Sequence, residues 1–162
     1  MFTQTMTAEQ VLEIYKDDVY KLSEYIPWLV DKSGKSVSSV YTQDGVGTNS
    51  VSFPVYDSTL MAFIKTAENT AFMDRNYKYV YTRNRIGNYK DELKIIRECT
   101  ILQMDILGGI LSKYILGGRT KSTYWREGMD YGVFCEVILK AKELVDFWVN
   151  ATTVMSDEEA RA

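Results

Sequence analysis

Residues 90–149 carry apolar side chains every three or four positions, which is the spacing of one face of an α-helix. The pattern is interrupted once, by the glycine-flanked segment LGGRTKSTYW at residues 116–125. We expect helices on both sides of this segment, with Gly117 and Gly118 ending the first of them by supplying a left-handed residue. So long a periodic block constrains the chain to a fold of packed helices.

Helix signals continue toward the N-terminus. Thr7 and Gln10 form a capping box, which predicts the start of a first helix. Pro27 either ends this helix or opens a short second one. Asp57 and Asn88 are expected to cap two further helices. Helices joined by short turns favour an all-α bundle.

Two glycines interrupt one of the expected helices. Gly108 and Gly109 each cost a helix about 1 kcal/mol relative to alanine. Such a cost is acceptable where another backbone comes close, so we predict a tight helix crossing at this point. Residues 74–88, in contrast, lose the helical period, and we assign no helix to them.

The segment near residues 36–53 differs from the rest because it is rich in Ser, Gly, Thr and Asn. It fits either a small β-hairpin that turns at Asp44–Gly45 or a long loop, and both alternatives stay open. An isolated two-stranded hairpin is marginal in water, so an ordered hairpin is expected to lie against the helices.

The predicted fold class is therefore mainly α: a single compact helical bundle with a small hairpin or a long loop. A chain of 162 residues is long enough to bury a substantial core. We expect one helical domain over residues 7–149. Residues 150–162, which end in SDEEARA, are expected to form a flexible acidic tail.

The chain contains no histidine, and this absence removes several kinds of site. It excludes a zinc site of the usual Cys/His kind and the Ser-His or Cys-His pair of nucleophilic catalysis. No cofactor and no metal ion is predicted. An enzyme would need a carboxylate, lysine, tyrosine or cysteine tuned by burial, in a deep pocket with perturbed pKa values.

The two cysteines, Cys99 and Cys135, are far apart in the sequence and fall on apolar helical faces. Buried thiols in a reducing cytosol are the expected state. The first residues, MFTQTMTAEQ, lack the pattern of a signal peptide, and no apolar stretch reaches the length of a membrane span. We therefore expect a cytoplasmic protein that does not contact membranes.

Charge is distributed unevenly along the chain. Residues 75–97 hold seven Lys or Arg residues against two acids, whereas residues 1–31 hold six acids against two bases. Tyrosines alternate with the cations, as in surfaces that bind single-stranded nucleic acid. The alternative is that this stretch packs on the acidic first or last helix. The candidate anion- or nucleic-acid-binding residues are Arg83, Arg85, Lys90, Arg119 and Lys121.

The segment GGRTKST superficially resembles a phosphate-binding loop, but it lacks the glycine immediately before Lys121 and follows a helix instead of a strand. A weaker anion site at Gly117, Gly118 and the next helix N-terminus stays open. The simpler interpretation is a helix C-terminus whose basic residues complement exposed carbonyl groups.

Three stretches together carry a resemblance to a known family: SFPVYDSTLMAFI at residues 52–64, NYKYVYTRN at residues 76–84 and ILSKYILGGRTKSTYW at residues 110–125. The chain resembles a bacterial family described only as a domain of unknown function, over most of residues 10–148. The resemblance implies a compact bacterial domain and brings no catalytic residue, substrate or cofactor with it.

These observations leave three alternative hypotheses for the function of the chain. The first is a non-enzymatic cytoplasmic helical domain that acts through protein contacts, with another protein or with itself, as an accessory or regulatory factor. The second is a nucleic-acid-associated protein that uses the five candidate cations, which requires them to cluster on one surface and not to disperse into separate ion pairs. The third is an enzyme with a histidine-free site.

Overall fold

The computed structural model describes residues 6–35, 38–44 and 50–161, with the side chains of 38–44, 50–55 and 153–161 left aside. Its elements in chain order are α1 (Ala8–Ser23), α2 (Ile26–Lys32), β1 (Ser38–Asp44), β2 (Ser50–Tyr56), α3 (Ser58–Glu68), α4 (Tyr77–Arg83), α5 (Tyr89–Glu98), the 3₁₀ turn η1 (Ile101–Gln103), α6 (Met104–Gly117), α7 (Thr123–Asp130) and α8 (Val133–Arg161).

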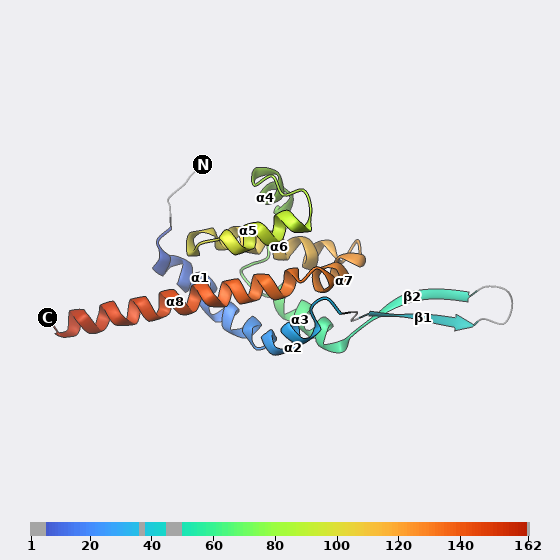
Figure 1. The fold of residues 1–162 in the computed structure, drawn as a ribbon, viewed down its shortest axis with the longest axis horizontal. Helices are drawn as coiled ribbons and strands as arrows, with labels where there is room; N and C mark the ends of the chain where they lie inside the picture. The colour runs from blue at the N-terminus through green and yellow to red at the C-terminus, as the bar shows by residue number, and fades with distance from the viewer. Residues whose placement is uncertain (1–5, 36–37, 45–49, 162) are drawn as a thin grey trace.

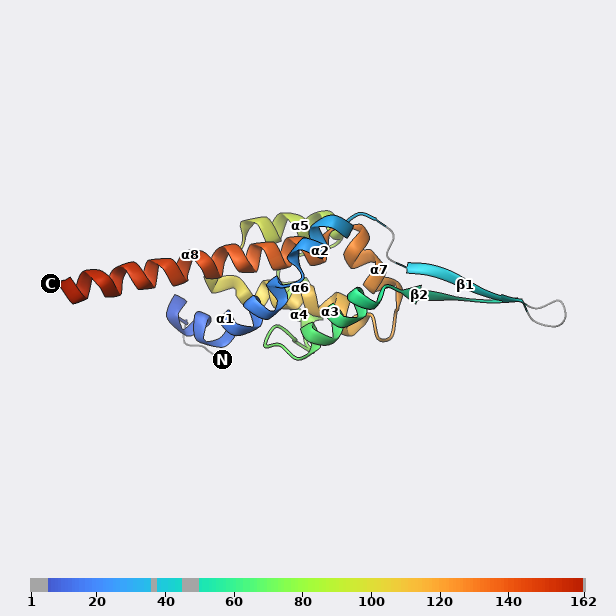
Figure 2. The ribbon, with the colours of Figure 1, turned by 90° about the horizontal axis from the view of Figure 1, so that it is seen from below.

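The fold is mainly α, as predicted: the described residues form eight helices, which pack in one compact body (Figure 1). α6 lies in the middle of that body and contacts α3, α4, α5, α7 and α8. The long helix α8 runs along it and packs against α1, α2, α5 and α7 (Figure 2). α6 is buried on almost every side, which is why its sequence is apolar around its whole circumference and not along a single stripe.

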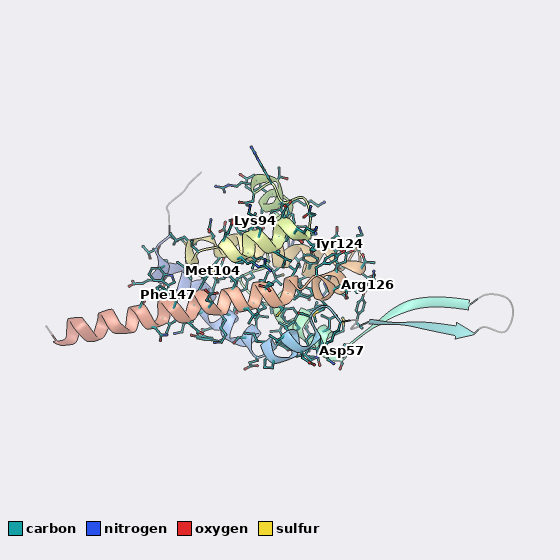
Figure 3. All side chains as sticks on the ribbon, viewed as in Figure 1. Asp57, Lys94, Met104, Tyr124, Arg126 and Phe147 are labelled. Carbon is teal, nitrogen blue, oxygen red and sulfur yellow. The ribbon has the colours of Figure 1, made fainter. Side chains whose placement is uncertain are left out.

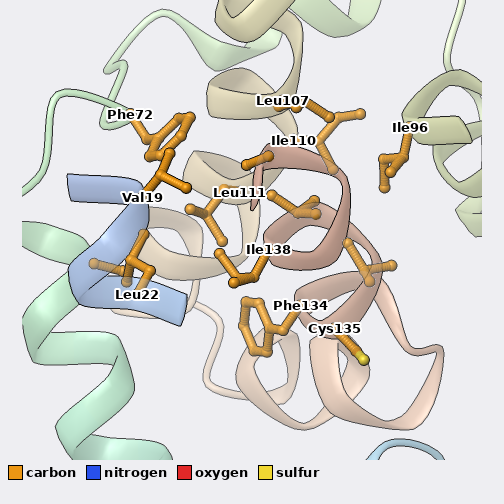
Figure 4. Close-up of a cluster of buried hydrophobic side chains, with 14 of the residues drawn as sticks. Val19, Leu22, Phe72, Ile96, Leu107, Ile110, Leu111, Phe134, Cys135 and Ile138 are labelled. Atoms are coloured by element: carbon orange, nitrogen blue, oxygen red, sulfur yellow. The ribbon is translucent and has the colours of Figure 1, made fainter. Parts of the chain in front are cut away.

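Side chains from α1, α5, α6 and α8 meet in one core, together with Phe72 from the connection after α3 (Figure 4). Phe63, Tyr114 and Phe134 form its aromatic part, with ring centroids 5.2 Å apart for Phe63–Phe134 and 5.9 Å apart for Tyr114–Phe134. Both pairs are edge-to-face, the arrangement that aromatic rings prefer. The apolar stripes of the sequence therefore converge on one interior.

The expected helix caps are present. Thr7 and Gln10 form the capping box of α1, and Pro27 lies in the first turn of α2. The Asp57 carboxylate accepts the Thr59 N–H, and the Asn88 side chain accepts two amides of α5. Each cap satisfies amides that have no partner within the helix, so these short sequence signals correctly locate the helix starts.

The predicted helix crossing at Gly108 and Gly109 is also present. A methyl group on Gly108 would lie 2.7 Å from the Phe72 carbonyl oxygen, and one on Gly109 would lie 2.7 Å from a Val80 methyl group. Residues 74–88, to which no helix was assigned, contain α4, which packs on α6 at this crossing. α4 has a single buried residue, Val80, too few for a periodic pattern.

Gly117 and Gly118 were predicted to end the helix by supplying a left-handed residue, and this prediction was wrong. α6 does end there, but Gly118 is right-handed, with φ −65°. Both glycines are needed because α7 comes close. A methyl group would lie 2.9 Å from the Tyr124 ring at Gly117 and 2.1 Å from Trp125 Nε1 at Gly118. The left-handed glycine of this region is Gly132, φ 75°, between α7 and α8.

Of the alternatives for residues 36–53, the structure has an antiparallel hairpin in which β1 pairs with β2, Ser38 opposite Tyr56 and Asp44 opposite Ser50. The proposed turn at Asp44–Gly45 lies outside the described residues. The expectation that the hairpin lies against the helices was wrong, because both ribbon views show it running away from the helical body (Figures 1 and 2).

Residues 150–162 were expected to form a flexible acidic tail, and their flexibility stays a prediction. In the structure α8 continues through Arg161, and its last part extends beyond the other helices (Figure 1). The apolar stripe ends near Trp148, but no glycine or proline follows to stop the helix. Within the described residues, no helix is long and apolar enough to cross a membrane.

Both cysteines are free and buried, as predicted. Burial raises the pKa of the Cys99 thiol to about 11, and burial also raises the pKa of Cys135. A thiol with a raised pKa holds little of the reactive thiolate at neutral pH. The two residues therefore serve the core as small apolar groups.

Candidate functional site

The five candidate cations lie on two different parts of the fold. Arg83 is the last residue of α4, Arg85 follows it with φ 56°, and Lys90 is in the first turn of α5. All three side chains are exposed, and none forms an ion pair within the described part of the chain. Arg119 and Lys121 follow α6 in the connection to α7.

Arg119 and Lys121 are engaged with neighbouring side chains. Arg119 forms an ion pair and a hydrogen bond with Glu68 at the end of α3. The Lys121 ammonium nitrogen lies 5.0 Å from the centroid of the Tyr124 ring, within the range of a cation–π contact. Dispersal of the five cations into separate ion pairs would argue against nucleic-acid binding. Arg119 is such a case, because Glu68 neutralises its charge.

The connection between α6 and α7 is a poor anion site. The backbone amides of Arg119, Thr120 and Lys121 donate to carbonyl groups at the end of α6, and those of Tyr124 and Trp125 donate within the turn. Amides that are already bonded cannot surround an anion. The simpler interpretation of this segment, a capped helix end, fits the geometry.

The most unusual site in the structure is built around Glu92, in the first part of α5, and the sequence patterns did not predict it. Its side chain is fully buried. The carboxylate accepts hydrogen bonds from the hydroxyls of Tyr81, on α4, and Tyr114, on α6, the latter at 2.5 Å. A buried carboxylate is very unfavourable unless it is paired in this way.

Lys113 completes the pairing. Its ammonium nitrogen lies 3.3 Å from Glu92 Oε2, and the side chain is 23 % exposed. The same nitrogen lies 4.6 Å from the ring centroid of Tyr114 and 5.2 Å from those of Tyr81 and Tyr124. We call Tyr81, Glu92, Lys113, Tyr114 and Tyr124 the Glu92 cluster; it joins α4, α5, α6 and α7.

The glycines of α6 bring this cluster together. Gly109 lets α4 approach at Val80, next to Tyr81, and Gly117 lets α7 approach at Tyr124. With larger residues at either position, the helices that carry the two rings would be held farther from Lys113. Gly109 and Gly117 therefore allow the helices to pack closely and also allow Tyr81 and Tyr124 to reach Lys113.

The electrostatics of the cluster affect the two phenols that bond to Glu92. Burial raises the pKa of Tyr81 and of Tyr114 well above the usual 10.0, and the negative charge and hydrogen bonds of Glu92 raise both further. Both phenols therefore stay protonated and donate to the carboxylate. A phenol with a raised pKa is a weaker acid than usual, so the cluster is suited to holding the helices and positioning Lys113.

A pocket opens beside the cluster, between α4, α6 and α7. Its volume is about 380 Å³, and its lining residues are Tyr77, Lys78, Tyr81, Thr82, Lys113 and Tyr124. Tyr124 lies at the end of α7 that is close to α6 (Figure 3). Lys113 therefore links the buried carboxylate to a surface pocket.

One sequence signal pointed to Glu92. It precedes Ile96 by four residues and Cys99 by seven, and both of these residues are buried. That spacing places Glu92 on the inward face of α5. Its donors come from other helices, 11 and 22 positions away in the sequence, and no local pattern predicts those distances.

Comparisons of the chain with protein-family models, with curated proteins and with solved structures found no match.

Proposed function

We propose that this chain is a non-enzymatic helical domain that acts through protein contacts in the cytoplasm, as an accessory or regulatory factor. The observation that carries the proposal is Phe147, whose side chain is 63 % exposed near the point where α8 leaves the helical body (Figure 3). Covering a phenylalanine side chain with a partner removes it from water, which contributes about 2 kcal/mol.

The partner that we propose is a second copy of the chain. α8 packs along α1, whose surroundings are acidic, since residues 1–31 carry a net charge of −4. Residues 75–97, which include α4 and α5, carry +5. In a two-fold dimer, the acidic side of each copy can face the basic side of the other, so the same contact forms twice.

The resemblance of residues 10–148 to a bacterial family of unknown function supports a bacterial origin. Two buried free thiols support a reducing compartment such as the cytoplasm.

Sedimentation velocity over a range of protein concentrations tests the proposal. We expect reversible self-association that weakens at least a hundredfold in Phe147→Ser, because the phenylalanine is lost from both copies at about 2 kcal/mol each and about 1.4 kcal/mol corresponds to a factor of ten. Met61→Ser is the control: Met61 is 39 % exposed on α3, outside both charged segments, and its replacement should leave the association constant unchanged. Monomeric behaviour of the unchanged protein throughout the range would contradict the proposal.

Nucleic-acid binding is a second candidate, now with a smaller set of residues. Arg83, Arg85 and Lys90 are exposed without ion pairs among the described residues, and Tyr79, beside them on α4, is 65 % exposed. Asp74 and Asp105, which line a pocket with Arg83, oppose phosphate binding at that point.

Fluorescence anisotropy with a labelled single-stranded oligonucleotide at low ionic strength distinguishes the two candidates. Nucleic-acid binding requires an affinity that falls steeply with salt and that falls further in Arg83→Gln and Arg85→Gln. The enzyme alternative gains no specific support, because the phenols of the Glu92 cluster are weaker proton donors than usual.

A further inference from the structure

The pocket beside the Glu92 cluster has a cation at its inner end. Lys113 carries three N–H donors, and its hydrogen bond to Glu92 uses one of them. Within the described residues, the other two have no hydrogen-bond acceptor. The ammonium group lies between the buried carboxylate and the pocket, so it can meet a ligand without leaving Glu92.

The rest of the lining also favours an anion. Lys78 is a second lysine of the lining, and among the described residues that line the pocket none carries a carboxylate. The Tyr77 and Tyr124 hydroxyls have no hydrogen-bond partner among the described side chains and backbone groups, so both remain free to donate. Lys121 adds a third cation nearby, 5.0 Å from the Tyr124 ring centroid.

Glu92 does not compete with a ligand for this space. Its side chain is fully buried, and both of its oxygens already accept hydrogen bonds. The carboxylate fixes the position of the Lys113 ammonium group, which is the arrangement that a preorganised binding site requires. The tyrosine rings around the ammonium nitrogen further restrict its movement.

We propose that this pocket binds a small ligand that combines an oxyanion group, phosphate or carboxylate, with an aromatic ring. The oxyanion accepts from Lys113 and Lys78, and the ring packs against Tyr77 and Tyr124. A volume of about 380 Å³ accommodates such a molecule. The site does not use Phe147, but its lining residues on α4 lie in the basic segment 75–97 that would also face a second copy in the proposed dimer. The titration is therefore carried out at a protein concentration at which the chain is monomeric.

Titration of the ¹⁵N-labelled protein, followed by amide chemical shifts, tests the site with three probes: inorganic phosphate, benzoate and phenyl phosphate. We expect saturable shifts at the pocket residues with phenyl phosphate, with benzoate, or with both, and a weaker response to inorganic phosphate. The comparison of benzoate with phenyl phosphate identifies the preferred oxyanion.

Variants assign the binding to the pocket. Lys78→Met and Lys113→Met should each weaken binding about tenfold, the size expected for one lost charge-assisted contact. Lys94→Met is the matched control, because Lys94 is an exposed lysine on α5 away from the lining (Figure 3). Lys113→Met removes the counter-charge of the buried Glu92 and can therefore disturb folding. Lys78 is exposed and lies outside the Glu92 cluster, so Lys78→Met tests binding without this effect on folding.

The absence of saturable shifts with both aromatic probes would overturn the proposal. Binding that weakens equally in Lys94→Met and Lys78→Met would do the same, because it would mark a nonspecific charge effect. Equal affinities for inorganic phosphate and phenyl phosphate would overturn the part of the proposal that assigns the ring to Tyr77 and Tyr124.

Discussion

Gly108 shows how one residue fixes the distance between two parts of the fold. A methyl group at this position would lie 2.7 Å from the Phe72 carbonyl oxygen and 3.3 Å from its Cα, both of which are backbone atoms. Backbone cannot move aside as easily as the end of a side chain. The backbone of Phe72 therefore requires a glycine at this position, although glycine has a lower helix propensity than alanine.

We predict that Gly108→Ala lowers the free energy of unfolding by about 1–3 kcal/mol, the usual cost of overpacking. Propensity alone predicts the opposite sign, a gain of about 1 kcal/mol. Urea unfolding followed by circular dichroism measures the change, with Lys94→Ala on exposed α5 surface as a nearly neutral control. A stabilised Gly108→Ala protein would show that the crossing is looser than described.

The tyrosines of the Glu92 cluster predict how stability depends on pH. Below the ordinary pKa of 10.0, folded and unfolded chains both hold the phenolic protons, and the contribution of Tyr81 and Tyr114 is complete. Above it the unfolded chain releases these protons first, since the folded pKa values are raised. The free energy of unfolding then falls by about 1.4 kcal/mol per pH unit for each tyrosine.

Urea unfolding at a series of values between about pH 9 and pH 11 measures this slope. Tyr81→Phe should make it shallower, because one of the two phenols is gone. Tyr79→Phe, on the exposed side of the same helix, should leave it unchanged. Identical slopes in the two variants would contradict the assignment of Tyr81 to the cluster.

Among the elements, α4 ends in a way that its sequence does not suggest. Arg85 has φ 56°. Its N–H donates to the Thr82 carbonyl, and the Ile86 N–H donates to the Tyr81 carbonyl. This is a Schellman motif, in which glycine usually occupies the left-handed position. An arginine in this conformation is strained.

We predict that Arg85→Gly raises the free energy of unfolding by about 0.5–1 kcal/mol, because it relieves the left-handed strain. Arg83→Gly, two residues earlier and still helical, should lower it by about 1 kcal/mol. Thermal and urea unfolding measure the change in the free energy of unfolding for each variant, and the two changes should have opposite signs. A loss of stability in Arg85→Gly would place Arg85 outside the left-handed region.

The helices could be predicted from the sequence to different degrees. α1 and α3 have apolar stripes and side-chain caps, α8 has a long apolar stripe, and α6 has a long apolar run, so their positions follow from local rules. α4 does not, because tertiary contact of Val80 with Gly109 holds it in place. The Glu92 cluster was missed for a related reason: its partners come from separate helices, and only folding brings them together.

At the scale of the whole molecule, the helical body and the hairpin are nearly independent. Tyr56, at the base of β2, connects them: its hydroxyl donates to the Ser122 carbonyl at 2.6 Å, and its ring packs edge-on against Trp125. The remainder of the hairpin extends away from the helices (Figure 1). The core is complete without it.

We predict that replacing residues 36–55 with a short glycine–serine linker leaves the helical body folded, with its free energy of unfolding changed by less than about 1 kcal/mol. Tyr56→Ala in the full chain should cost more, because it removes a hydrogen bond and an aromatic contact. Urea unfolding compares the two proteins. Loss of cooperative unfolding in the linker variant would contradict the independence of the hairpin.

Native-state amide hydrogen exchange tests most directly the claim that all the packed helices share one interior centred on α6. The buried amides of α6, together with those of α1, α5 and the part of α8 before residue 150, should exchange only by global unfolding. Amides of β1, β2 and residues 153–161 should exchange far faster. If the hairpin were protected as strongly as α6, or if α6 exchanged as fast as the end of α8, the account would be wrong.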